Sequence, residues 1–219
     1  RKGTLGMDRS TNSLIQQMAD DLEPVRPMLM RDGIMLVVTA VVITVLGIAF
    51  LPGLWDGVWS GDASMFFVVT NGLLLILGCA AASSVLQMAN PRVGNQHDGP
   101  RWASLMVAVL PAAALLSLFG HEHPMESLTD SYGVKCFGAA MLASLLTAIA
   151  LVLWLRRGAP VAPATAGMHL GIAATALGSA AYGLACPFDG AVHLGVWHVA
   201  PVLAGALLGR FALPPLLRW

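Results

Sequence analysis

The stretch Ile34–Leu51, with the sequence IMLVVTAVVITVLGIAFL, decides the fold because it holds no charged residue from end to end. A helix of about 20 such residues crosses the hydrocarbon core of a bilayer, which is about 30 Å thick. Five further stretches of similar apolar character follow: Met65–Met88, Trp102–Phe119, Cys136–Leu155, Thr165–Ala185 and Leu194–Leu213. The sequence therefore predicts an all-α polytopic membrane protein with a bundle of six transmembrane helices.

The composition supports a membrane protein and argues against nucleic-acid binding. Hydrophobic residues make up 57% of the 219-residue chain and charged residues only 11%. A soluble globular domain carries about 25% charged residues. The formal net charge is zero and the basic residues form no patch, so we expect contact with membrane lipid and no direct contact with nucleic acid.

The basic residues fall on alternate sides of the six stretches, which predicts the orientation through the positive-inside rule. Segments expected in the cytoplasm contain Arg1, Lys2, Arg9, Arg26, Arg31, Arg92, Arg101, Arg156, Arg157, Arg210 and Arg218. The connections expected outside contain one basic residue, Lys135, beside six acidic ones. We expect a bacterial inner (plasma) membrane protein with both termini in the cytoplasm. A cytoplasmic segment, residues 1–31, would precede a transmembrane domain, residues 32–219, with residues 1–6 an upstream extension without a function.

The N-terminal segment is predicted to contain a short amphipathic helix. Ser13 is its candidate N-cap, and Pro24 and Pro27 would end it. Its apolar residues recur at helical spacing: Leu14, Ile15, Met18 and Leu22. The helix has acidic but no basic residues after Ser10, which favours a groove on a partner protein over the membrane surface. Docking of the helix on its own bundle is the alternative.

The interior of the spans is poor in ionisable and catalytic groups. Coupled transporters usually keep ionisable residues within their spans, but no Asp, Glu or Lys lies in a span core here. Asn71 and His169 are expected to form interhelical hydrogen bonds, and Cys79 is interpreted as a small buried hydrophobe. The sequence has no Gly-rich phosphate loop, HExxH or GxSxG motif, so we expect a protein that is not an enzyme and has no obligatory cofactor.

Small residues predict that the last two spans pack closely. Glycine pairs at four-residue spacing let helix backbones approach each other, and each of these spans has one such pair: Gly167 with Gly171, and Gly205 with Gly209. Pro111 and Pro201 also lie inside predicted spans, where they are expected to kink the helices.

Two cysteines are expected at the outer face of the membrane. Cys136 opens the fourth span and Cys186 closes the fifth, in an oxidising compartment if this is a bacterial inner membrane. The residues leave three alternatives open: a disulfide, two thiolate ligands of a soft metal ion, and two unpaired thiols. His198, about one turn into the sixth span, is a candidate imidazole donor to the same place. The candidate metal ligands are thus Cys136, Cys186 and His198, with His193 and Trp197 as auxiliary residues.

Several short motifs, in one order and spacing, carry a family resemblance. They are Asp21-Leu22-Glu23-Pro24-Val25-Arg26, Cys136, Leu155-Arg156-Arg157-Gly158-Ala159-Pro160, Cys186-Pro187, Trp197-His198 and Leu208-Gly209-Arg210. From Met7 onward the chain resembles the NrsF-type family, integral-membrane anti-sigma factors that negatively regulate an extracytoplasmic-function sigma factor of bacteria.

The resemblance implies a partner and a signal. The segment around Leu14–Arg26 would hold the sigma factor at the membrane, through Leu14, Ile15, Met18, Asp21, Leu22, Pro24, Val25 and Arg26. Cys136 and Cys186 would be the sensing pair, in a family associated with heavy-metal and oxidant stress. A soft heavy-metal ion is therefore expected as a signal and not as a cofactor.

Two other classes of function compete with this interpretation. A small transporter or channel for a metal or solute would use the outward Cys and His residues as an entry site. A thiol-redox membrane enzyme would use Cys136 and Cys186 in catalysis, but they lie on separate helices and not in a CxxC motif.

Overall fold

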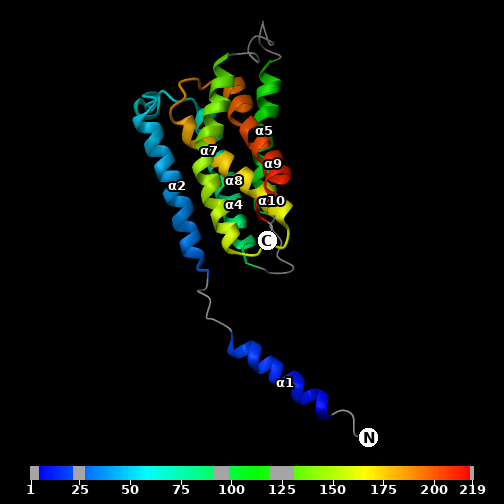
Figure 1. The fold of residues 1–219 in the computed structure, drawn as a ribbon. Coiled ribbons are helices and arrows are strands. Elements are labelled where there is room, and N and C mark those ends of the chain that lie inside the picture. Colours follow the sequence, from blue (N-terminus) through cyan, green and yellow to red (C-terminus); the bar gives the residue numbers. More distant parts are fainter. Residues whose placement is uncertain (1–4, 22–27, 91–98, 119–130, 218–219) are drawn as a thin grey trace.

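The computed structural model describes residues 5–21, 28–90, 99–118 and 131–217, and every regular element within these ranges is a helix. The helices are α1 (Leu5–Asp20), α2 (Met30–Phe50), α3 (Gly57–Ser60), α4 (Met65–Met88), α5 (Gly99–Leu118), α7 (Ser131–Arg157), α8 (Pro163–Gly183), the π-helix η1 (His193–His198), α9 (Ala200–Ala212) and α10 (Pro214–Leu217). The predicted all-α class is confirmed. The long helices form one bundle, and α1 lies apart from it (Figure 1).

Four helical segments are long and apolar enough to cross a membrane. They are α2, α4, α7 and the segment His193–Ala212, which joins η1 to α9. The apolar part of α5, Pro100–Leu116, is shorter, and α8 is not among the four. Four of the six predicted stretches therefore have the length and composition of a membrane span. Each of the six stretches nevertheless overlaps a helix of the bundle.

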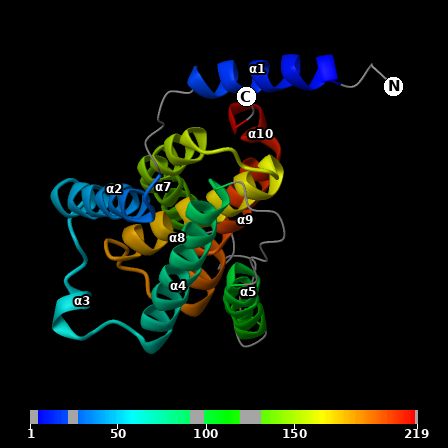
Figure 2. The same ribbon diagram turned by 90° about the horizontal axis from the view of Figure 1, so that it is seen from below.

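The position of α8 explains its weaker apolar character. It runs through the middle of the bundle, and α4, α7 and α9 pack around it (Figure 2). Most of its residues are buried, and many are Ala or Gly. A helix enclosed by other helices gains from small residues that allow close packing and does not need a strongly apolar surface toward lipid.

The predicted close contact between the last two long helices is confirmed. A Cβ atom on Gly171 would overlap the carbonyl oxygen of Gly205, and one on Gly167 would overlap that of Gly209. Both pairs of glycines therefore lie on the crossing of α8 and α9, where the backbones touch. Since Cys186 follows α8 and η1 precedes α9, this crossing also fixes how these two segments meet.

Two predictions about the interior are wrong. The Asn71 amide donates to the carbonyl of Phe67 in its own helix, at 3.0 Å, and its Oδ1 has no partner, so the expected interhelical hydrogen bond is not formed within the described part of the chain. Cys79 is exposed on the surface of α4 and not buried. The prediction for Cys79 failed because α4 is apolar around its whole circumference, so its sequence does not tell which side faces the neighbouring helices. His169 is buried in α8.

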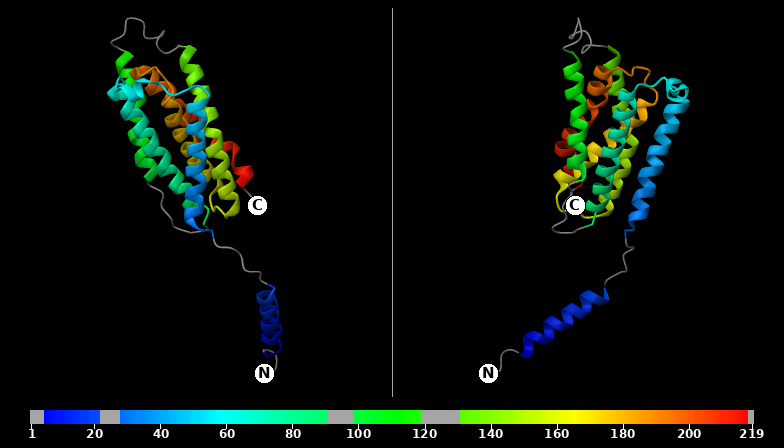
Figure 3. Two further views of the ribbon diagram at one scale, coloured as in Figure 1. Left: turned by 90° about the vertical axis from the view of Figure 1, so that its left-hand side faces the viewer. Right: turned by 180° about the vertical axis from the view of Figure 1, so that it is seen from behind.

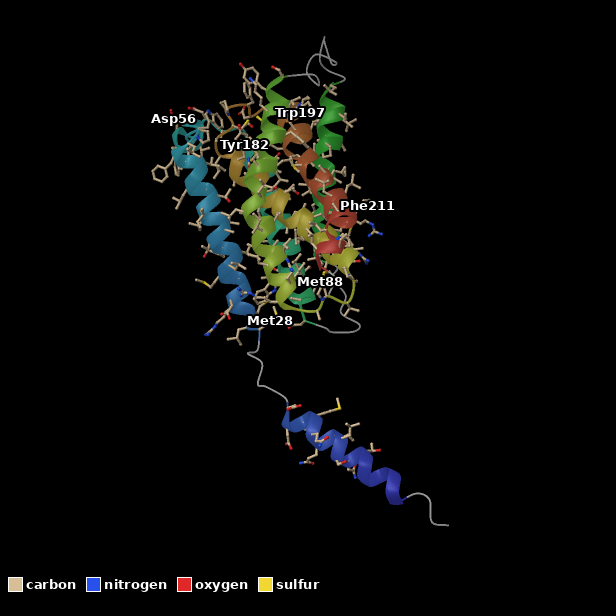
Figure 4. All side chains as sticks on the ribbon, in the orientation of Figure 1. Met28, Asp56, Met88, Tyr182, Trp197 and Phe211 are labelled. Atoms are coloured by element: carbon tan, nitrogen blue, oxygen red, sulfur yellow. The ribbon has the colours of Figure 1, made fainter. Side chains whose placement is uncertain are left out.

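One end of the bundle joins the start of α2 to the ends of α4 and α7. The indole Nε1 of Trp154 donates to the carbonyl of Leu86, at 3.2 Å. Gly33 of α2 lies against the same indole, since a Cβ there would be 2.9 Å from the ring. Met28 and Met88 mark this end in Figure 4. The chain leaves this end of the bundle toward α1.

The opposite end is closed by hydrogen bonds between connections. The backbone N–H of Trp55 donates to the carbonyl of Leu184, at 2.9 Å. The Ser64 N–H donates to the carboxylate of Asp189, and its hydroxyl donates to the Asp189 carbonyl, both at 3.0 Å. The same hydroxyl accepts from the N–H of Phe67 and caps α4. These bonds hold the connection that carries Cys186.

The segment before α9 is a π-helix, which the sequence analysis did not predict. Pro201 lies in the first turn of α9, directly after η1 and inside the helical segment His193–Ala212, and the expected kink at this residue stays a prediction. Proline is tolerated there because the N–H groups of a first turn have no partner within the helix. Val202 donates to Val199 and not to His198, and the carbonyl of His198 instead accepts from the Ser179 hydroxyl, at 2.6 Å. Pro111 does lie inside α5.

Helix α1 differs in its start from the predicted helix. It begins at Leu5, so Ser13 lies within it and is not its N-cap. Leu14, Ile15 and Met18 are 57%, 58% and 64% exposed, and α1 stands away from the bundle in both views of Figure 3. Of the predicted sigma-binding residues, Asp21 is exposed, and Leu22, Pro24, Val25 and Arg26 lie outside the described residues.

Candidate functional site

Four sulfur and nitrogen donors meet at the end of the bundle opposite to α1. Cys136 comes from the start of α7, Cys186 from the connection after α8, and His193 and His198 from the two ends of η1. The sulfur atoms of the cysteines are 3.6 Å apart, and Nε2 of His193 is 3.4 Å from the sulfur of Cys186. One donor atom from each of the four residues lies within 4.8 Å of all the others. The structure thus groups Cys136 and Cys186 with both histidines.

Three of the four donor residues are closed to solvent. Cys136 is 5% exposed, and Cys186 and His198 are fully buried. His193 is partly buried, and Phe188 packs against it with ring centroids 5.3 Å apart. On the other side, the ring of Tyr182 stacks on His198 at 6.3 Å. Aromatic rings therefore flank both imidazoles and restrict their orientation.

The π-helix explains why the two histidines face the same place. In an α-helix, with 3.6 residues per turn, two side chains that are five residues apart point about 140° away from each other. In a π-helix the hydrogen bonds join residues i and i+5, so these residues lie above one another. His193 and His198 are five residues apart in η1, and their ring centroids lie 5.6 Å from each other. Single π-turns are frequent at functional sites.

Trp197 has a packing role beside the site. Its indole lies on Gly133 in the first turn of α7, where a Cβ would overlap the ring. Trp197 is not one of the four grouped donors, and its Nε1 has no hydrogen-bond partner among the described residues. The contact brings η1 against α7 one helical turn before Cys136. Trp197, the predicted auxiliary residue, therefore provides a packing contact between η1 and α7, which both carry donors.

The two thiols influence each other directly. The hydrogen bond with Cys136, together with burial, raises the pKa of the Cys186 thiol. Cys186 also lies 3.8 Å from the carbonyl of Phe188, which can accept its proton in a weak hydrogen bond. Both residues are free cysteines. A pair of thiols beside two imidazoles can bind a soft or borderline metal ion after losing protons, or can be oxidised to a disulfide.

Several residues of the site were missed by the sequence analysis. They are Ser179, Tyr182 and Phe188, which pack against or hydrogen-bond to donor residues, and Gly133, which packs against Trp197. Their nearness in sequence to Cys136 and Cys186 was the only available signal. Cys79 lies in α4 and does not belong to the group of donors.

Comparisons with known proteins identify the family. The family described as "NrsF: Negative regulator of sigma F" matches residues 18–219. The chain is 36% identical over 93 residues to the anti-sigma-F factor NrsF of Caulobacter vibrioides, and this match covers 42% of this chain and 44% of that protein. It is 28% identical over 156 residues to a probable anti-sigma-F factor NrsF of Azospira oryzae, covering 70% and 72%. No solved structure matches. The chain therefore belongs to the NrsF family of negative regulators of sigma F.

Proposed function

We propose that this protein is an integral-membrane anti-sigma factor that holds an extracytoplasmic-function sigma factor and releases it when the Cys136–Cys186 pair receives a signal. The observation that carries the proposal is the family match, which extends from within α1 to the end of the chain. Both curated relatives are named as anti-sigma-F factors, one of them as probable. A negative regulator of this kind acts by binding a sigma factor and not by catalysis.

The proposed topology has six spans, with both termini in the cytoplasm of a bacterium. Charge supports this orientation: Arg31, Arg156 and Arg157 lie at the end of the bundle nearest α1, whereas Asp56 and Asp189 lie at the end that holds the cysteines. By the positive-inside rule the first end faces the cytoplasm. The cysteine pair would then face the periplasm, while α1 would face the sigma factor.

The proposed sigma-binding element is α1 with the residues that follow it. Leu14, Ile15 and Met18 lie within one turn of each other and are all more than half exposed. Amphipathic helices with an unpartnered apolar stripe commonly bind in a groove of another protein. The acidic Asp20 and Asp21 beside the stripe favour a protein groove over an anionic lipid surface.

The proposed signal acts on the packing of α7 against the α8–η1 connection. Cys136 and Cys186 come from different elements, so a bond or an ion that joins them constrains how these elements pack. Heavy metal and oxidant are both compatible with a pair of buried thiols.

Co-purification tests the proposal. The full chain and a version lacking Met7–Pro27 would be extracted from membranes together with the sigma factor. We expect sigma to remain bound to the full chain only, with equal amounts of both versions in the membrane. Absence of sigma from both would refute the proposal.

The transporter alternative is not favoured. Among the described residues no Asp, Glu, Lys or Arg is buried, and the buried polar side chains are Ser, Thr and His. A route for an ion would need charged or strongly polar groups at several depths.

A further inference from the structure

We propose that Cys136, Cys186, His193 and His198 form a tetrahedral site for one divalent d¹⁰ cation, Zn²⁺ or Cd²⁺. The inference rests on the proposed function in one respect, that this ion is the signal the pair receives. The site itself follows from the four donors, which lie in one buried group.

The distances fit tetrahedral coordination. With zinc–sulfur bonds of about 2.3 Å and zinc–nitrogen bonds of about 2.0–2.1 Å, two sulfur ligands lie about 3.8 Å apart, and sulfur and nitrogen about 3.6 Å. The corresponding distances are 3.6 Å between the two sulfur atoms and 3.4 Å between Cys186 and His193. The widest separation in the group, at most 4.8 Å, needs to shorten by about 1 Å to reach a tetrahedral edge.

His198 gives an independent reason to expect a ligand. Its side chain is completely buried, and neither ring nitrogen makes a hydrogen bond of regular geometry among the described residues, where its interaction is with the Cys136 thiol. A buried polar group without a partner is costly, and most such groups in native proteins are satisfied. A metal ion bound to one ring nitrogen supplies a partner. A disulfide between Cys136 and Cys186 would not give the ring nitrogens of His198 a partner.

Charge selects a divalent ion. Binding exchanges two protons for the metal, because each thiol must become a thiolate: M²⁺ plus two thiols gives the bound dithiolate and two H⁺ released to water. Two thiolates and two neutral imidazoles around M²⁺ carry no net charge. A neutral complex avoids the large cost of an uncompensated charge in a closed site. A monovalent ion with the same ligands would leave one negative charge.

Packing and hydrogen-bonding contacts also hold the two imidazoles in place. The π-turn of η1 aligns them, Tyr182 stacks on His198, Phe188 packs against His193, and the Ser179 hydroxyl fixes the backbone of His198. Outer contacts of this kind orient metal ligands in proteins. Cys136 is carried by the long helix α7, so ion binding joins α7 to the η1 segment.

Titration of the reduced full chain in detergent with Cd²⁺, and separately with Co²⁺, tests the site. We expect one Cd²⁺ per chain with thiolate-to-metal charge-transfer absorption, and a Co²⁺ spectrum of tetrahedral intensity. His198→Phe keeps a ring of similar size but removes the donors, and should weaken Cd²⁺ binding at least ~100-fold. Cys79→Ser, which changes a cysteine outside the group, should bind like the unchanged chain.

Two results would overturn the site: Cd²⁺ binding by His198→Phe with unchanged affinity, or a Co²⁺ spectrum of the unchanged chain without tetrahedral character. The second result decides the matter even if His198→Phe does not fold. Failure of the proposed function is a separate result, because it would show as absence of sigma from the complex while Cd²⁺ still binds. Failure of the site alone would show as bound sigma without Cd²⁺ binding.

Discussion

Replacement of Leu14 and Met18 by Asp should release the sigma factor from the membrane protein. These side chains are 57% and 64% exposed on α1, so a partner groove can still bury more than half of each. Complete burial of a Leu or Met side chain contributes about 1.5–3 kcal/mol. The exposed shares therefore amount to about 2–4 kcal/mol for the pair, or ~30- to 1,000-fold in Kd. The buried carboxylates of the variant would add to this loss.

The assay is a binding titration of purified sigma factor onto the full chain reconstituted in lipid nanodiscs. Gln16→Asp is the matched control, because residue 16 lies on the opposite face of α1 and is also exposed. The control introduces the same charge into the same helix and should change Kd less than about threefold, as expected for a surface substitution worth under ~0.5 kcal/mol. An unchanged Kd in the double variant, with the helix content retained, would refute the assignment of α1 as the binding element.

Three further changes test the site and the packing. Cys136→Ser or Cys186→Ser should abolish metal- or oxidant-dependent release of sigma, measured as sigma retained on membranes after treatment; normal release by both variants would remove the pair as the sensor. Gly171→Ala should lower the midpoint of thermal unfolding in detergent, because the new Cβ overlaps the Gly205 carbonyl and overpacking costs about 1–3 kcal/mol. Gly138→Ala, which has nothing within 4 Å, should leave the midpoint equal or higher; a fall of equal size in both would contradict the packing argument. Trp154→Phe should cost about 1 kcal/mol through the lost hydrogen bond to α4, and an unchanged midpoint would argue that this bond adds nothing.

The fold followed largely from apolar length and from small residues. The six predicted stretches each overlap a helix, since the requirement that a span satisfies its own backbone hydrogen bonds leaves few alternatives for such sequences. The glycine pairs of α8 and α9 also predicted a backbone contact correctly. By contrast, the face that Cys79 presents could not be predicted, because neighbouring helices and lipid are both apolar.

The candidate site was predictable in part. Equal depth in the membrane suggested that Cys136, Cys186 and His198 come from one level of the bundle, and the structure groups them. His193 was expected in a loop, as an auxiliary residue. It belongs to the group because η1 is a π-helix, and no periodicity in so short a segment indicates a π-turn. Pro201 was the available hint, since proline cannot donate the backbone hydrogen bond that would continue an α-helix through it.

The proposed coupling between the two ends of the bundle has a structural route. Helix α7 carries Cys136 near one end and Trp154 near the other, about 27 Å along a single helix. The Trp154 indole lies against Gly33, close to the start of α2, and α2 is the helix that follows the N-terminal segment. A change in the tilt of α7 would therefore act directly on α2, the helix that follows the proposed sigma-binding element. Complete release, from about 99% to 1% bound sigma, needs a difference of ~5.5 kcal/mol between the two packings. Structural Zn²⁺ sites contribute about 10–16 kcal/mol of binding free energy, so about a third to a half of that energy would suffice if it favoured one packing of α7.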